Sequence, residues 1–132
     1  MSSPTPREVT LDFFADLNAG KQEEAFARLA PEVVYRIVAP DPYGGAVNAA
    51  GLLEKAGALF EKFAEPFIIN IQTVICEDEH VVLEAQGKAL TKRGGDYVNN
   101  YVFIFRVVDG LIVEAKEYLD TAAYIALLED QI

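Results

Sequence analysis

From Phe67 to Leu119 the chain consists of segments typical of β-strands, joined by short polar or glycine-containing turns. The four segments cover residues 67–76, 81–92, 97–108 and 111–119. Turns this short connect antiparallel strands, because a parallel connection needs a crossover of a dozen or more residues. This part of the sequence therefore predicts an antiparallel meander.

The residues before Phe67 show helical patterns instead. Thr5, Pro6 and Glu8 are typical of a helix start, in which a capping threonine is followed by proline and then by an acidic residue. Apolar residues then recur at helical spacing until Asn18-Ala19-Gly20. The remaining predictions are helices over 23–29 and 49–64, a strand over 33–38, a loop over 41–45 and a short helix over 121–128.

Helices first and an antiparallel meander afterwards indicate an α+β fold. The 132 residues suit one domain spanning 1–132, and 52% hydrophobic residues are enough to form a core. One face of such a sheet needs cover, which the three N-terminal helices can provide. Because long twisted strands curl, helices laid across them leave a cavity between the two layers. A functional site is expected in that cavity.

The charge balance excludes several classes of partner. Eleven basic and twenty-one acidic residues give a formal net charge of −10. A surface this acidic repels nucleic acid and anionic lipid, so neither is expected as a partner. The N-terminal MSSPTPREVT lacks the apolar core of a signal peptide, and no apolar run approaches the roughly 18 residues of a membrane span. The expected location is the cytoplasm.

Few residues of the chain are suited to hold a metal or a nucleotide. Cys76 is the single cysteine, expected to be a small buried hydrophobe, and His80 is the single histidine, expected in a solvated acidic turn. Gly94-Gly95 links two strands and does not precede a helix, so it is a hairpin turn and not a phosphate-binding loop. No metal and no other cofactor is expected.

The register of the last hairpin decides which side chains share a face. A two-residue type I′ turn at Asp109-Gly110 pairs Val108 with Leu111, whereas a type I turn with Gly110 in a G1 bulge pairs Val107 with Leu111. A slip of one residue exchanges the two faces completely. The bulge register separates apolar from charged side chains more cleanly and is the one predicted.

The bulge register has a chemical consequence at Glu117. The carboxyl then lies on the inner face, which is the face towards the helices, opposite Tyr101. Desolvation there is expected to raise the pKa of Glu117 towards values useful for general acid–base catalysis. The same inner face carries Tyr97, Asn99, Phe103, Phe105, Val107, Leu111, Val113, Ala115 and Leu119, while Arg106, Glu114, Lys116 and Asp120 face outward.

Four further polar residues are candidates for the site. Tyr35 and Tyr101 are expected to form pocket wall with a hydrogen-bonding tip. Asn99 is interpreted either as orienting a substrate carbonyl or as satisfying Glu117. Asp41, in a proline-flanked loop, is either a turn former or a second catalytic group.

The residues also resemble a known family. "LDFFADLNAGKQEEAFARLAPEVVYRI" and, after a loop and a helix, "YVNNYVFIFRVVDGLIVEAKEYLDT" are similar to nuclear transport factor 2-like domains, and within them to the SnoaL-like polyketide cyclases. The resemblance implies a cone-shaped, strongly curved mixed sheet wrapped over the three N-terminal helices, with a deep apolar pocket. It also implies a homodimer formed through the outer face of the sheet.

The resemblance further implies roles for individual residues. The acid–base carboxylate of SnoaL-like cyclases falls on Glu117. Two proton donors of the similar ketosteroid isomerases fall on Phe13 and Phe103, so that chemistry is not expected. The catalytic base of the isomerases precedes a Pro-x-Gly motif. The same motif is present at Asp41-Pro42-Tyr43-Gly44, but it lies four residues away from the position that an alignment without gaps would give it. Of the Asp-Arg-Asp set of the similar limonene epoxide hydrolases, only one acid has a counterpart, in Glu117.

Two functional hypotheses follow from these observations. In the first, the chain is a cofactor-free enzyme acting on a small apolar molecule with a carbonyl or epoxide group. Glu117 moves the proton, Tyr101, Asn99 and Tyr35 hold an oxygen, and Asp41 is a second catalytic candidate. In the second, it is a non-catalytic module that holds a hydrophobic ligand or dimerises. The pocket in either case is expected to include Phe13, Phe103 and Leu119.

Overall fold

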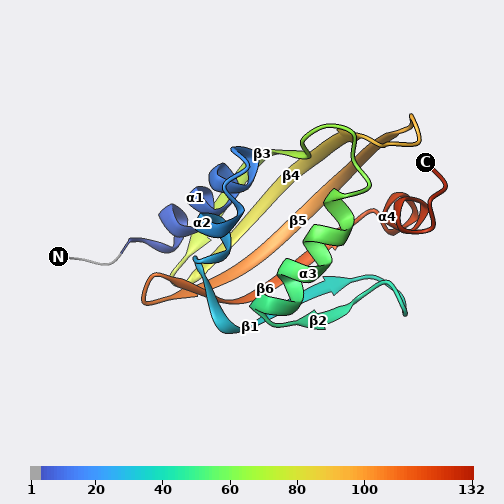
Figure 1. Ribbon diagram of the computed structural model, residues 1–132. Helices are drawn as coiled ribbons and strands as arrows, with labels where there is room; N and C mark the ends of the chain where they lie inside the picture. Colours follow the sequence, from blue (N-terminus) through green and yellow to red (C-terminus); the bar gives the residue numbers. More distant parts are fainter. Residues whose placement is uncertain (1–3) are drawn as a thin grey trace.

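The computed structural model describes residues 4–132, and Figure 1 shows helices packed on one side of a curved sheet. In chain order the elements are α1 (Pro6–Asn18), α2 (Gln22–Phe26), β1 (Leu29–Val38), β2 (Gly45–Val47), α3 (Ala49–Phe60), β3 (Ile68–Glu77), β4 (His80–Leu90), β5 (Asp96–Val108), β6 (Leu111–Leu119) and α4 (Thr121–Leu128).

The sheet has six strands in the order β2-β1-β6-β5-β4-β3. All neighbouring strands are antiparallel except β1 and β6, which are parallel. Helices α1, α2 and α3 lie on one side of the sheet, and α4 follows β6. The predicted α+β fold, a curved mixed sheet over three N-terminal helices with a short C-terminal helix, is confirmed.

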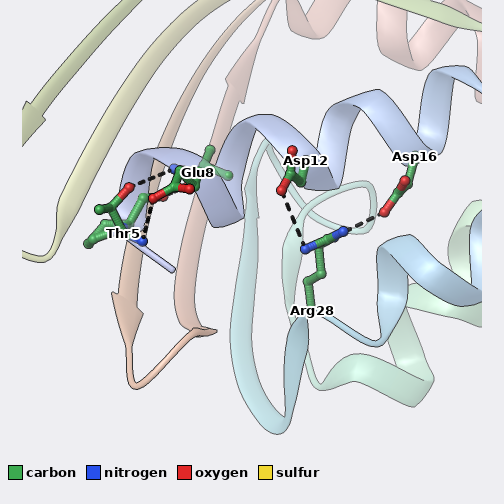
Figure 2. A network of polar contacts seen from close by, with 7 residues as sticks. Thr5, Glu8, Asp12, Asp16 and Arg28 are labelled. Carbon is green, nitrogen blue, oxygen red and sulfur yellow. Dashed lines mark hydrogen bonds and ion pairs between the residues drawn. The ribbon is translucent and has the colours of Figure 1, made fainter. Parts of the chain in front are cut away.

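Helix α1 is fixed at its start and along its length by polar contacts (Figure 2). The Thr5 hydroxyl accepts the Glu8 backbone N–H while the Glu8 carboxylate accepts the Thr5 N–H, which is the predicted cap with its reciprocal bond. Arg28, just after α2, reaches back to α1, with Nε 3.0 Å from Asp16 Oδ2 and Nη1 3.8 Å from Asp12 Oδ2. These contacts hold α1 and α2 together.

The Asn-Ala-Gly sequence after α1 has a structural role. The Asn18 amide donates to the Ile69 backbone oxygen at 2.8 Å and accepts the Ile69 N–H at 2.9 Å. Gly20, with φ of 77°, then turns the chain in the left-handed region that glycine tolerates best. Helix α1 is thereby attached to β3, at the edge of the sheet.

The β5–β6 turn differs from the predicted one. Asp109 and Gly110 both have positive φ, 51° and 79°, and Val108 pairs with Leu111. This is the type I′ turn, so the predicted G1 bulge is wrong. The bulge lies instead three residues into β6, where Val113 is the extra residue between the pairs of Ile112 and Glu114.

The Val113 bulge restores the predicted faces beyond it. Phe103 pairs with Glu117, and Tyr101 with Leu119, so Glu117 lies on the inner face but opposite Phe103 and not Tyr101. Before the bulge the faces are reversed, because Leu111 is exposed and Ile112 is fully buried. The prediction for Leu111 is therefore wrong, and that for Glu117's face is confirmed.

Two smaller expectations are also corrected. Cys76 is exposed and not buried, because it lies near the end of the edge strand β3, where neighbouring residues are exposed as well. Strand β2 was not predicted, since the expected loop ends at Gly45, the first residue of this strand; β2 has three residues and pairs with β1 alone. Within the described residues no helix is long and apolar enough to cross a membrane.

Aromatic rings fill the centre of the core between α1 and the sheet. Phe14 of α1 stacks on Phe105 at a centroid distance of 5.6 Å, and Phe13 meets the same ring edge-on at 5.8 Å. Phe103 lies 4.8 Å from Phe14 and extends the cluster towards Glu117. Burial of rings of this size dominates core energetics, so the cluster fixes how α1 sits on the sheet.

Candidate active site

A cavity of about 260 Å³ lies between the sheet and the helices. Its walls come mainly from β1, β5 and β6 on the sheet side and from α1, α3 and α4 on the other, with one residue each from β3 and α2. Most lining side chains are aliphatic or aromatic hydrocarbons, and the polar exceptions are four tyrosines, two lysines and one carboxyl, Glu117. An apolar pocket with a few polar groups is the usual form of a small-molecule site.

Glu117 occupies a central position in the sheet. Strand β6 lies between β1 and β5, so Glu117 has Ile37 on one side and Phe103 on the other. The hydroxyl of Tyr35, from β1, donates to Glu117 Oε1 at 2.6 Å. Tyr35 is 4% exposed and Glu117 is half-buried, and both side chains line the cavity, so the bond lies in the cavity wall. The parallel pairing of β1 and β6 is what brings these two side chains together.

Burial raises the pKa of Glu117 to about 7, while the Tyr35 hydrogen bond and the positive charge of Lys55 lower it by less. Near neutral pH the carboxyl therefore populates both protonation states, as a group that both accepts and returns a proton requires. Burial, together with the charge of Glu117, raises the pKa of Tyr35 well above its ordinary value. Tyr35 thus remains a neutral donor.

A second polar cluster lies farther along β5. The hydroxyls of Tyr97 and Tyr101 are 2.9 Å apart, and Asn99 Nδ2 donates to Tyr97 Oη at 2.8 Å. The Asn99 amide also pairs with the backbone of Asp120, donating to its oxygen at 3.0 Å and accepting its N–H at 2.8 Å. Asp120 caps α4 by accepting the Ala122 N–H.

The structure divides the predicted site residues into two groups. The residues that line the cavity are Phe13, Tyr35, Tyr101, Phe103 and Glu117. Three others do not line it: Asn99, Leu119 and Asp41.

The structure explains why each of these three residues does not line the cavity. Asn99 is bonded to Asp120 and Tyr97 beneath the wall, not to Glu117. Leu119 packs on the core one pair beyond Glu117. Asp41 is exposed, and its neighbours Pro42 and Tyr43 reach the cavity instead.

Sequence reasoning missed the part of the wall that α3 and α4 provide. Tyr124 of α4 and Lys55 of α3 both line the cavity, and Tyr124 is 6% exposed. Tyr124 lies one turn after the cap Asp120, and that spacing was the available signal. The eight residues of α4 are apolar almost all round, so no periodicity indicated which side faces inward.

Comparison with known proteins identifies one family. Residues 10–115 match a family model described as SnoaL-like domain. No protein of curated function matches the chain. Within residues 4–132, no three His, Cys, Asp or Glu side chains are grouped so as to hold a metal ion.

Several solved structures share the fold. IdmH from Streptomyces antibioticus, provisionally assigned as a polyketide cyclase, is 18% identical with a TM-score of 0.78, over 96% of this chain and 99% of that one. TerC, co-crystallised with polyporic acid, is 21% identical with a TM-score of 0.78, over 94% and 98%. An NTF2-like protein from Burkholderia thailandensis is 16% identical with a TM-score of 0.82, over 95% and 98%. At these identities the likeness shows the fold alone.

Proposed function

Because the chain belongs to the SnoaL-like domain family, we propose that it is an acid–base enzyme of the isomerase, cyclase or hydrolase type that needs no cofactor. Its substrate is a small, largely apolar molecule with a carbonyl or epoxide group. The observation that carries the proposal is one carboxyl, Glu117, in an otherwise apolar pocket with its pKa raised to about 7. Perturbed carboxyls in clefts are markers of function.

In the proposed reaction Glu117 is the proton carrier. As a carboxylate it removes a proton from the carbon next to a carbonyl, and the electron pair moves to the carbonyl oxygen. The protonated Glu117 then returns the proton to another atom of the same molecule, which completes an isomerisation. With an epoxide, the carboxylate instead takes one proton from a water molecule as the water oxygen bonds to a ring carbon. The bond between that carbon and the epoxide oxygen breaks, and protonated Glu117 returns its proton to the resulting alkoxide to give the diol. Tyr35 holds the carboxyl in place through its 2.6 Å bond.

The test measures proton transfer directly. Wild-type protein in D₂O is expected to accelerate deuterium uptake next to the carbonyl of small apolar ketones, followed by NMR. The Glu117→Gln variant is expected to lose this acceleration by a factor on the order of 10²–10⁴, typical of a general base, with ketone affinity unchanged. Glu114→Gln, an exposed glutamate on the same strand, is the matched control.

Exchange that persists in the Glu117→Gln variant would remove Glu117 from this role. The hydrolase version of the proposal is tested by incubating the protein with a panel of epoxides in H₂¹⁸O. The ¹⁸O label is expected in the diol product.

A second candidate function is supported by the aromatic wall. Phe13 and Phe103 are 2% exposed and packed against other rings, and Tyr101 stacks on Phe103 at 5.3 Å. A pocket built this way is also suited to hold a hydrophobic ligand without reacting. Native mass spectrometry of the purified protein tests this role, which predicts a bound molecule that is released unchanged after incubation.

We also propose that two copies associate through the outer face of the sheet. Apolar side chains on that face are exposed, among them Val34 at 50%, Val98 at 40% and Tyr118 at 41%. They come from three adjacent strands, β1, β5 and β6, and lie opposite the side that the helices cover. Tyr118 pairs with Val38 on one side and with Val102 on the other, so apolar side chains adjoin across these three strands. Adjoining apolar groups on a surface are typical of protein–protein contact sites, and an isologous pair uses one such face twice.

A further inference from the structure

The direction of the hydrogen bonds beneath the cavity can be determined from the backbone of Asp120. Its N–H is a donor and its carbonyl oxygen an acceptor, and both contact the Asn99 side chain. The Asn99 oxygen must therefore face the N–H, and its nitrogen must face the carbonyl. Because the same nitrogen is 2.8 Å from Tyr97 Oη, Asn99 donates to Tyr97.

Tyr97 then has only one place for its own proton. Its side chain is fully buried and does not line the cavity. Among the described residues its hydroxyl has two partners, the Asn99 nitrogen, which is a donor, and the Tyr101 oxygen. A buried hydroxyl is rarely left without an acceptor. Tyr97 therefore donates to Tyr101, and the proton of Tyr101 is left to point elsewhere.

Tyr101 is the member of this chain that reaches the cavity. It lines the wall together with Glu117, and no other hydrogen bond to its hydroxyl is formed within residues 4–132. Burial raises the pKa of Tyr101, and the charge of Glu117 raises it further, so the hydroxyl keeps its proton at neutral pH. Hydrogen bonds in a chain polarise one another, which makes the last donor stronger than an isolated tyrosine.

We propose that Asn99, Tyr97 and Tyr101 form a one-way donor chain whose open end binds a substrate oxygen. The site then selects an oxygen that accepts hydrogen bonds, as in a ketone, ester, quinone or enolate. Tyr101 touches the substrate, while Tyr97 and Asn99 are positioning residues that act through it. This inference rests on the proposed function for the role of the bound oxygen, but its geometry is independent of turnover.

The proposal is tested by ligand binding and infrared spectroscopy, with no turnover required. The probes are 1-tetralone, labelled with ¹³C at its carbonyl, and tetralin, which has the same bicyclic frame without oxygen. Wild type is expected to bind the ketone about tenfold more tightly than the hydrocarbon, the usual effect of one hydrogen bond of this kind. The carbonyl band of the bound ketone is expected at lower frequency than in an apolar solvent.

The variants separate the members of the chain. Tyr101→Phe is expected to abolish both the ketone preference and the frequency shift. Tyr97→Phe keeps the Tyr101 hydroxyl but removes its polarisation, so a smaller frequency shift is expected. Tyr118→Phe removes an exposed hydroxyl from the outer face and is expected to change neither. Thermal melts of each variant identify loss of folding, and the Tyr97→Phe result remains informative if Tyr101→Phe does not fold.

Three outcomes would overturn the proposal. The first is equal affinity of wild type for ketone and hydrocarbon. The second is a carbonyl band of the bound ketone that is the same in Tyr101→Phe as in wild type. The third is a frequency shift that is lost in Tyr124→Phe and not in Tyr101→Phe. Repeating the spectra in the Glu117→Gln background keeps the two proposals distinct. A protein that shows the shift but no proton exchange retains the donor chain and loses the proposed enzyme function.

Discussion

At the residue scale, Glu117 makes folding depend on pH. The folded-state pKa of about 7 lies above the ordinary value of 4.5 because the carboxyl is buried. Between these two values the folded chain binds a proton that the unfolded chain has released, so stability falls as pH rises through this window. The difference of about 2.5 pKa units corresponds to roughly 3 kcal/mol that is absent above pH 7.

Replacing Glu117 with glutamine is therefore expected to stabilise the protein at high pH. The amide resembles the protonated carboxyl and still accepts the Tyr35 hydrogen bond. Relative to wild type, we expect a free energy of unfolding higher by roughly 2–3 kcal/mol at pH 8, and nearly equal at pH 4. Urea denaturation at both pH values measures the difference. Glu114→Gln is the control for general charge effects, and an equal Glu117→Gln effect at both pH values would contradict the prediction.

The sequence predicts which residues face inward better than what they bond. Strand alternation placed Tyr101, Asn99 and Glu117 on one face, and the structure agrees. It could not show that the Asn99 amide is used by Asp120, because that contact depends on how α4 packs at the end of β6. Nor could it show that Tyr35, 82 residues away, bonds to Glu117. Long-range contacts of this kind are absent from local patterns.

At the element scale, the β5–β6 hairpin shows what a hydrophobic pattern determines. Arg106 and Lys116 must avoid the core, which fixes the faces in the middle of the hairpin. Two different routes lead to those faces, a bulge within the turn or a type I′ turn followed by the Val113 bulge. The hydrophobic pattern determines which face a side chain is on but not where the bulge lies. Glu117 was therefore predicted on the correct face but opposite Tyr101, whereas its partner is Phe103.

In strand β4, the absence of a side chain at Gly87 makes room for the ring of Phe67, the residue before β3. A Cβ atom at Gly87 would lie 2.3 Å from Phe67 Cζ and 3.0 Å from Tyr101 Cε2, far inside van der Waals contact. We expect Gly87→Ala to destabilise the protein by about 1–3 kcal/mol, as for other overpacked cores. Chemical denaturation measures the change.

A double-mutant cycle with Phe67→Leu identifies the cause. Leucine shortens the side chain that a new Cβ meets, so Gly87→Ala should cost less in that background. An equal cost in both backgrounds would assign the effect to the strand backbone and not to the ring. Gly57→Ala is the control, because a Cβ at this α3 position meets nothing within 4 Å.

At the scale of the whole molecule, the outer face of the sheet predicts the state of association. We expect the protein to sediment as a dimer at micromolar concentration and Tyr118→Lys to shift it towards monomer, because the charge would be buried between two copies. Leu53→Lys is the control, since Leu53 is 48% exposed on α3, on the opposite side of the sheet. Analytical ultracentrifugation measures both. A wild-type monomer, or equal effects of the two variants, would contradict the proposed contact.

The position of β6 between β1 and β5 also sets an order for folding. Before β6 pairs, β2–β1 and β5–β4–β3 are separate parts with no shared hydrogen bonds, and β1 has an open edge. Pairing β1 with β6 closes a long stretch of chain, a kind of contact that slows folding. On the ribosome, β1 is synthesised long before the strand that completes it. The carboxyl of β6 and its tyrosine partner on β1 therefore meet only once these two strands have paired.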